Sequence, residues 1–483
     1  MRRSERRGGA RFDRVGLSRL IAVLVACAPI AAAEEIPSLE VALQKALARS
    51  PLMRAAGASL EAFEAQYREA WWSWWPRMDL KVLATVIPPQ AEDADNTQVV
   101  IDSTGANTEY RVVTGPDITD WNFWMKVDLT GYVPLYTFGK LSTLKEMAER
   151  GVDVGHEARR LAESELRFQV SRAWFGLALA QELDLLIEDG EDKLKKARER
   201  LEKLEEEDDP EFDQADLFRL RMYEAQVRKI VLTNRHLKGV SQTGLRVALG
   251  LPEAEPLIVP AIGLTALPVT VGPIDCYVDK LARHRPELRM KRHEARVKGI
   301  EVDRKWADFW PDFFLAGSFT YAYSTVEQQD TAFSSTVFNA LGGGAALGMK
   351  LDLDYPGKVA RYQRAQADHE RVKAELEVAL GLIRVELDDV WRTATGQAEL
   401  LGVQERAMKA ARSMLVLRTQ EYENGVDDSA RFKDVLDAAV GYLSQKSEWL
   451  SATYAFNGAV LRLSRLVGED VVTARCPLTT TPD

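Results

Sequence analysis

The most constraining feature of this sequence is a helical hairpin pattern between Gly357 and Gly468, with its tip in residues 422–438. On the first limb, apolar residues recur every three or four positions from Val372 to Tyr422, which is the spacing of one helix face. At about 1.5 Å per residue, this limb would be roughly 100 Å long. Because no ordinary core covers such a helix, it must pack against similar helices in its own chain or in other copies.

The hairpin pattern occurs twice, so the sequence reads as a tandem duplication. The landmarks of the first copy recur 218 residues later: Gly139 as Gly357, Asp216 as Asp434, and Gly250 as Gly468. We therefore divide the chain into a first repeat at residues 34–250, a linker at 251–273, a second repeat at 274–468 and a C-terminal tail at 469–483. The linker has little pattern, and the tail is expected to be loose.

Each repeat begins with an amphipathic helix, ends it at a Trp-Pro pair, and continues with two segments of alternating apolar and polar residues. The alternation predicts four strands, at residues 78–87, 122–135, 313–323 and 345–354. A long hairpin follows the second strand of each pair, at residues 139–250 and 357–468. Gly342-Gly343-Gly344 lacks the Lys-Ser/Thr of a phosphate-binding loop and is expected to be a loop hinge.

The predicted strands have one apolar face and one polar face over about ten residues, as strands of a membrane barrel with a wet lumen do. The alternative is a soluble antiparallel sheet packed on a core. Aromatic residues flank the strands and favour the membrane, at its interface with water, although they could instead belong to the core of a packed helix end. These residues are Trp71, Trp74, Trp75, Trp121 and Trp310.

Four strands cannot close a barrel, since the smallest spanning barrels have about eight and lipid does not tolerate open sheet edges. The strands must therefore be pooled across two or three copies, giving about eight or twelve strands. The long helices, pooled in the same way, would continue the barrel as a second tube. The predicted fold class is thus an α+β membrane protein.

Residues 1–33 read as a secretory signal peptide, with seven Arg before an apolar run and a small-residue cleavage site at Ala31-Ala32-Ala33. Cys27 offers a competing lipid-attachment site. Removing residues 1–33, which carry Glu5 and Asp13 besides the seven Arg, changes the net charge from −10 to −15. Such a charge argues against nucleic-acid binding.

The sequence contains no catalytic constellation. The five His are scattered, no metal site or cofactor is predicted, and the chain is not expected to be an enzyme. Without the signal peptide only Cys276 and Cys476 remain, and the sequence leaves open whether they pair.

The order of these elements resembles the outer-membrane efflux protein family whose namesake is TolC. The resemblance rests on the signal peptide, the two copies of helix, Trp-Pro, strand, loop and strand, the Gly-Lys that opens each hairpin, and the sequence DVLDA at residues 434–438. It implies a homotrimer with a twelve-stranded barrel in the outer membrane and a helical tunnel in the periplasm. It also implies two protein partners, a periplasmic adaptor (membrane fusion) protein and an inner-membrane pump, besides outer-membrane lipid.

The resemblance also implies two kinds of site. Asp434 and Asp437 match the aspartates that line the constriction of the tunnel in this family. Their i, i+3 spacing puts both carboxylates on one helix face, although on spacing alone they could be two residues of a solvated face. The hairpin tips are where the adaptor would dock, and their residues here are Gly425, Asp427, Asp428, Glu207 and Asp208.

The function that this reading favours is an exit duct for an inner-membrane pump, in a tripartite efflux or type I secretion system. The principal alternative is a structural periplasmic coiled-coil protein without a transport role, and a secreted enzyme is a third possibility. The sequence does not distinguish a drug, a metal ion or a polypeptide as the substrate, and it does not identify the pump or the adaptor class.

Overall fold

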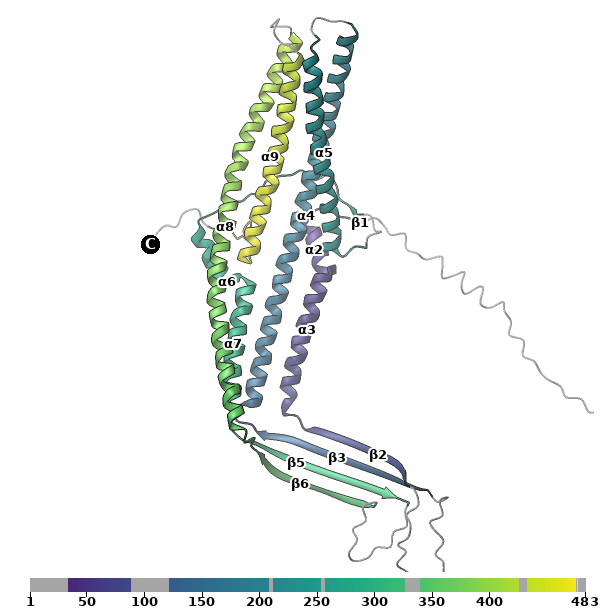
Figure 1. Ribbon diagram of the computed structural model, residues 1–483, viewed down its shortest axis with the longest axis vertical. Helices are drawn as coiled ribbons and strands as arrows, with labels where there is room; N and C mark the ends of the chain where they lie inside the picture. Colours follow the sequence, from purple (N-terminus) through teal and green to yellow (C-terminus); the bar gives the residue numbers. More distant parts are fainter. Residues whose placement is uncertain are drawn as a thin grey trace, which may run out of the picture. The chain divides into compact units, whose positions relative to one another are not determined.

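The structure is a computed structural model that describes residues 34–87, 121–207, 212–252, 257–325, 339–424, 432–474 and 476. The predicted signal peptide and Cys27 lie outside these residues. The fold is α+β, with long helices and one four-stranded sheet (Figure 1). The strands are β1 Glu34–Glu35, β2 Arg77–Ile87, β3 Asn122–Tyr136, β4 Leu257–Ile258, β5 Asp312–Ser324 and β6 Ala340–Lys350. The helices are α2 Leu39–Arg49, α3 Pro51–Trp71, η1 Trp72–Trp74, α4 Lys140–Glu206, α5 Gln214–Leu249, α6 Ile274–His284, α7 Pro286–Ala307, α8 Tyr355–Asn424 and α9 Phe432–Val467.

The chain divides into two compact units. One contains Met1–Gly57, Arg159–Pro286 and Leu382–Asp483, and the other contains Ala58–Ala158 and Glu287–Gly381. We call them the hairpin unit and the sheet unit. Helices α4 and α8 contribute residues to both. Within the described residues, no helix is both long and apolar enough to span a membrane.

The sheet unit contains the four-stranded sheet, with the order β2-β3-β5-β6 and antiparallel pairing throughout. Figure 1 shows β3 and β5 in the middle of this sheet and β2 and β6 at its edges. Each repeat therefore contributes two neighbouring strands, and the two pairs meet between β3 and β5. Both outer edges lack a further strand among the described residues.

The register places apolar side chains on one face of the sheet and polar side chains on the other. Leu80 pairs with Leu129, which pairs with Phe319 in the next strand. One residue further, Lys81, Asp128 and Thr320 align on the opposite face, where Asp128 pairs with Lys126 at 2.9 Å and accepts a 2.8 Å hydrogen bond from Thr320. The period-two alternation of the sequence is thus realised across the strands as two chemically distinct faces.

The apolar face is not covered by the rest of the described chain. Leu80 is 64% exposed, and on β6 Leu341 and Leu347 are 76% and 77% exposed. A soluble sheet packed on its own core would bury these side chains. The alternative of such a sheet is therefore not realised within one copy of this chain.

Strand β6 differs from the prediction of a strand at 345–354. It includes Gly342-Gly343-Gly344, because these glycines pair with Thr320, Phe319 and Ser318 of β5, so the predicted loop hinge is wrong. It ends at Lys350, which pairs with Asp312, the first residue of β5. Residues 351–354 therefore have no strand opposite them, and their alternation was a misleading signal.

Helices α3, α4, α7 and α8 complete the sheet unit. A Cβ added at Gly155 of α4 would lie 3.0 Å from the Leu60 side chain of α3, so glycine permits close approach there. On its other side, α4 pairs with α7, where Glu157 lies 3.2 Å from Arg289. At its start, Lys140 binds Asp312 at 2.8 Å and so joins α4 to the first residue of β5.

The hairpin unit is held by an apolar core that the helical stripes predict. One cluster joins α2, α4 and α5 around Ile36, Val170 and Leu245, all fully or almost fully buried. Others bring α9 against α4 and α5. Gly250 and Gly468 end the hairpins with positive φ angles of 67° and 79°, which glycine adopts without strain.

The C-terminal tail was expected to be loose, and this prediction is wrong for its first residues. Cys276 and Cys476 form a disulfide with Cα atoms 6.1 Å apart. Lys280 of α6 also donates to the carbonyl of Ala474 and pairs with Glu469 at 3.1 Å. The tail is therefore fastened to α6 up to Cys476, which answers the pairing question that the sequence left open.

Candidate functional site

The candidate site lies where α5 and α9 begin. Asp213 caps α5 by accepting a 2.8 Å hydrogen bond from the backbone N–H of Ala215, as Asp commonly does at this position. Helix α9 begins at Phe432 and carries Asp434 in its first turn, where a negative charge is favourable next to the helix N-terminus. Asp437 follows one turn later, so α9 presents both carboxylates on the same side.

Asp437 is bound by two side chains of α5. The hydroxyl of Tyr223 donates a 2.6 Å hydrogen bond to Oδ1 of Asp437. Nε of Arg219 lies 3.9 Å from the same oxygen, while Nη1 of Arg219 binds Asp216 at 2.6 Å. A chain of polar contacts therefore joins the first turns of α5 to the first turns of α9, from Asp216 through Arg219 to Asp437.

The contact with Arg219 reduces the repulsion expected between the carboxylates of Asp434 and Asp437. Two carboxylates on one helix face repel each other, but Arg219 places a positive charge close to Asp437. Attraction between opposite charges at this distance offsets part of that repulsion. Asp437 is thus held by side chains of the neighbouring hairpin.

The phenol of Tyr223 is also affected by the contact. Burial, followed by the hydrogen bond to Asp437 and the charge of Asp437, raises the pKa of Tyr223 to about 12, against a smaller opposing effect of Arg219. A phenol that donates to a carboxylate must keep its proton, because a phenolate would place two negative charges together. The contact is therefore present only while Tyr223 is protonated.

Asp434 and Asp437 also line a hollow of 460 Å³ between α8 and α9. Arg418 of α8 lies in the same hollow and is paired with Glu421 at 2.8 Å. The remaining lining residues are small or neutral: Ala411, Met414, Ala438, Gly441, Ser444 and Gln445. In the described part of the chain, no cluster of three or more His, Cys, Asp or Glu could hold a metal ion.

Sequence reasoning identified the two aspartates and missed their partners. Arg219 occupies the position in the first repeat that Asp437 occupies in the second, 218 residues later. In the sequence, Tyr223 falls on the apolar stripe of its helix, with Leu220 and Val227. The available signal was the opposite charge at equivalent positions, since equivalent positions of two paired hairpins can face each other.

Most of the predicted docking residues lie outside the described residues: Asp208, Gly425, Asp427 and Asp428. Glu207 is described, is exposed, and lies 3.7 Å from Lys203 one turn before it on α4. Its carboxylate is therefore on the surface, within reach of a partner protein.

The predicted interface aromatics are exposed. Trp71, Trp74 and Trp75 are 45%, 50% and 55% exposed, and Trp121 is 61% exposed. Trp310, at 45%, stacks against Phe138 with ring centroids 5.3 Å apart. Rings with this much free surface are not the core of a packed helix end in a single chain.

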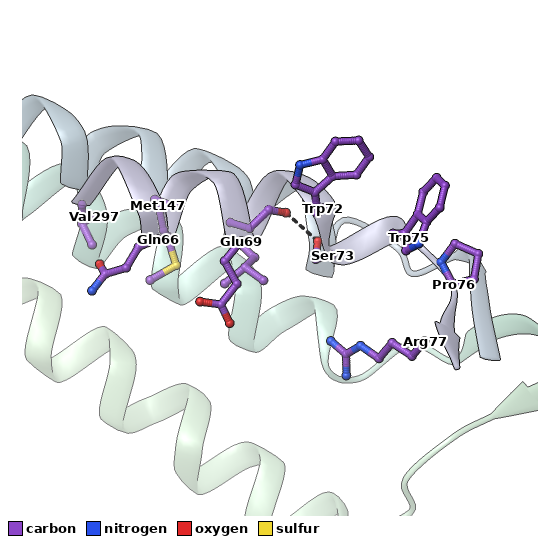
Figure 2. A pocket seen from close by; sticks show the side chains of 12 residues that line it. Gln66, Glu69, Trp72, Ser73, Trp75, Pro76, Arg77, Met147 and Val297 are labelled. Carbon is purple, nitrogen blue, oxygen red and sulfur yellow. Dashed lines mark hydrogen bonds between the residues drawn. The ribbon is translucent and has the colours of Figure 1, made fainter. Parts of the chain in front are cut away.

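A second, larger hollow of 1040 Å³ lies between α3, η1, α4 and α7 in the sheet unit (Figure 2). Trp72, Trp75 and Arg77 line it together with Met147 of α4 and Val297 of α7. Figure 2 shows the hydrogen bond of 2.7 Å that Ser73 donates to the carbonyl of Ala70, which holds the turn between α3 and β2. Apolar walls with a few polar groups are typical of sites for organic molecules.

Comparison with known proteins identifies the architecture. Residues 277–469 match the family profile described as "Outer membrane efflux protein". No sequence among the curated proteins matches the chain.

Solved structures share the fold. The MtrE outer membrane channel of Neisseria gonorrhoeae, in its open state, superimposes with a TM-score of 0.67 at 18% identity, covering 90% of this chain and 90% of that one. The outer membrane protein VceC of Vibrio cholerae gives a TM-score of 0.66 at 20% identity, covering 89% and 96%. A membrane protein of Pseudomonas aeruginosa gives 0.67 at 18% identity, covering 89% and 90%.

The profile match confirms the resemblance that the sequence predicted, and the fold is that of the channels with which it was compared. The similarity to the outer membrane efflux protein family thus lies in the second repeat, and the fold of the chain is shared with outer-membrane channels.

Proposed function

We propose that this chain is the exit duct of a tripartite efflux or type I secretion system, which passes substrates from an inner-membrane pump and a periplasmic adaptor to the exterior. In this proposal, three copies pool four strands each into a twelve-stranded barrel. Their hairpins form the periplasmic tunnel. The observation that carries the proposal is the four-stranded sheet, whose apolar face and two edges are left uncovered by the described residues.

The apolar face and the edge strands of the sheet favour an assembly in which several copies share one barrel. Leu80 and Leu347, 64% and 77% exposed, belong to one apolar face of the sheet. In a bilayer, the acyl chains of the lipid would cover that face. The backbone groups at the outer edges of β2 and β6 would still lack hydrogen-bond partners, because the bilayer core offers none. Pairing β2 of one copy with β6 of the next closes the sheet and removes both edges.

The long helices support the same assembly. Apolar side chains of α8 remain exposed in the single chain, including Val378, Leu382 and Val385 at 60%, 65% and 69%. Leu232, Val240 and Val247 of α5 are 53–66% exposed. Neighbouring copies would cover these side chains, since contiguous exposed apolar surface usually marks an interface.

The contact between Tyr223 and Asp437 supports a closed state of the tunnel entrance. Opening would move α5 away from α9, which breaks the hydrogen bond and separates Arg219 from Asp437. On a threefold axis, Asp434 and Asp437 would form carboxylate rings that favour cations near the entrance. An open state is named for the MtrE channel, and we propose one for this chain.

The proposed partners are those that the resemblance to the efflux family implies. The periplasmic adaptor would dock at the hairpin tips, where the side chain of Glu207 is exposed, and the inner-membrane pump would supply the energy for transport. The duct itself would be passive. The principal alternative is a structural periplasmic coiled-coil protein, in which the apolar sheet face would have no lipid to contact.

The test is to extract the full chain from outer membranes, reconstitute it in planar bilayers and record single-channel currents. The proposal predicts discrete conductance steps and an assembly that changes its electrophoretic migration on heating. A protein that elutes as a soluble monomer without detergent and gives no conductance would favour the structural alternative.

A further inference from the structure

A small hollow of 270 Å³ lies beside the turn that connects α3 to β2. Lys145 of α4 lines it together with Trp71 and Trp74, and its remaining walls are Ala70, Ser73, Leu141 and Ser142. Its volume is below the range of about 300–1,000 Å³ that holds whole drug-sized molecules. The hollow therefore suits a compact polar group rather than a complete organic ligand.

Lys145 is the charged group of this hollow. Its Nζ lies 3.5 Å from the centroid of the Trp71 ring, a distance at which the ring face attracts an ammonium. Lys140, Lys298 and Lys305, in helices of the same unit, each pair with an Asp or a Glu. Lys145 has no carboxylate partner within the described part of the chain, so its positive charge is available to an external anion.

The hollow lies on a different side of α4 from the contact between Lys140 and Asp312. Lys140 binds Asp312 at 2.8 Å, and residues 141, 142 and 145 lie roughly 100–200° around α4 from Lys140. Trp75 and Arg77 line the larger hollow of Figure 2, and the two hollows share only Ala70 and Ser73 as lining residues. Lys145 is therefore on a different side of α4 from Lys140, and its hollow borders the turn that leads from Trp74 to Met78, the first apolar residue of β2.

An anion at this place would meet two kinds of surface. The ammonium of Lys145 supplies the polar contact, while the hydroxyl of Ser142 donates to the carbonyl of Gly139 at 3.0 Å. Just beyond the turn, Met78 and Leu80 are 68% and 64% exposed and present hydrocarbon. A molecule that joins an anionic group to an acyl chain matches both surfaces at once.

We propose that this hollow binds the phosphate of an anionic phospholipid headgroup, with Lys145 as its charged contact and the indoles of Trp71 and Trp74 as its walls. The acyl chains then run along the apolar face that starts at Met78. This inference rests on the proposed function, because it requires that face to be in lipid. It assigns to Trp71 and Trp74 a specific ligand, beyond a general preference for the membrane interface.

Native mass spectrometry of the full-length assembly in detergent tests this proposal, with phosphatidylglycerol and phosphatidylcholine as the two probes. The wild-type protein is expected to bind phosphatidylglycerol more tightly than phosphatidylcholine. Lys145→Gln should weaken phosphatidylglycerol binding about fivefold, the effect of one cation near an anionic lipid surface, and leave phosphatidylcholine unchanged. Lys145→Arg keeps the charge and should bind as the wild type does.

Lys81→Gln is the matched control, because it removes the same charge from the opposite face of β2. It should leave the lipid preference intact. The proposal is overturned if Lys145→Gln binds phosphatidylglycerol as tightly as the wild type does. It is also overturned if Lys81→Gln weakens binding equally, or if millimolar inorganic phosphate displaces the bound species, since the ligand would then be a free anion.

Conductance measured on the same preparations separates this inference from the proposed function. Normal conductance without a lipid preference would overturn the lipid site alone. Absence of conductance in the wild type would contradict the duct, whatever the lipid data show.

Discussion

Tyr223 of α5 donates a 2.6 Å hydrogen bond to Asp437 of α9, so a side chain of the first repeat holds an aspartate of the second. Arg219 lies 3.9 Å from the same carboxylate. The two hairpins are thus tied together near their tips by polar contacts, which can be broken and remade at low cost compared with an apolar core.

Tyr223→Phe should favour the open state of the channel. The substitution removes the hydroxyl while keeping the ring, so the closed state loses one hydrogen bond to a charged group. We expect the ratio of open to closed time to rise by about tenfold, measured by single-channel recording. Tyr442→Phe on α9 is the control, because no side-chain hydrogen bond of Tyr442 occurs within the described residues. An equal effect of both substitutions would contradict a specific role of the contact.

The contact should also depend on pH in the alkaline range. The pKa of Tyr223 is raised to about 12 in the linked state, whereas an ordinary tyrosine titrates near 10. Between these values the linked state binds more protons than the separated state, so raising the pH disfavours the link. Open probability should therefore increase as the pH rises from about 10 to 12 in the wild type. Tyr223→Phe should not show this alkaline rise in open probability. An identical pH profile in both proteins would mean that Tyr223 does not cause the rise.

Asp434→Ala combined with Asp437→Ala should raise the conductance or weaken block by divalent cations in planar bilayers. The reason is that the proposed carboxylate rings would be removed from the entrance. Glu448→Ala removes an exposed carboxylate further along α9 and should leave the block unchanged. Unaltered block in the double variant would mean that the constriction lies elsewhere.

A pair of neighbouring substitutions tests the assignment of the sheet faces. Leu129→Arg places a charge on the apolar face and should destabilise the folded barrel by about 2–4 kcal/mol near the bilayer midplane. Thr130→Arg places it on the polar face and should be tolerated. The measurement is denaturant unfolding in lipid vesicles. Equal losses of unfolding free energy in the two variants would contradict the assignment of the sheet faces.

Replacing Cys276 and Cys476 with Ser should lower stability, because their disulfide closes a loop of 200 residues. A loss of about 2–5 kcal/mol is typical for native disulfides of small secreted domains, and release of the tail from α6 should accompany it. Thermal unfolding with and without reductant measures the first effect. A wild-type protein insensitive to reductant would show that the bond contributes little.

The strands were largely predictable because their signal is local. Alternation of side chains fixes both the strand and its faces, and β2, β3 and β5 lie within a residue or so of their predicted bounds. The start of β6 was not predictable in the same way. Gly342, Gly343 and Gly344 have no side chains that could alternate, and only their pairing with β5 makes them a strand.

The contacts of the candidate site depend on residues far apart in the sequence. Tyr223 and Asp437 are 214 positions apart, and the disulfide spans 200. Tyr223 follows the apolar spacing of α5, but periodicity does not say which polar group its hydroxyl contacts. The duplication could have suggested the partner of Asp437, since Arg219 occupies its equivalent position with the opposite charge.

In the proposed assembly, several copies of the chain pool their strands to close one barrel. The most direct test of this pooling is the mass of the assembly extracted from outer membranes in detergent, measured by native mass spectrometry. We expect three copies, which give twelve strands from four in each chain. A single copy, soluble without detergent, would contradict the pooling of strands.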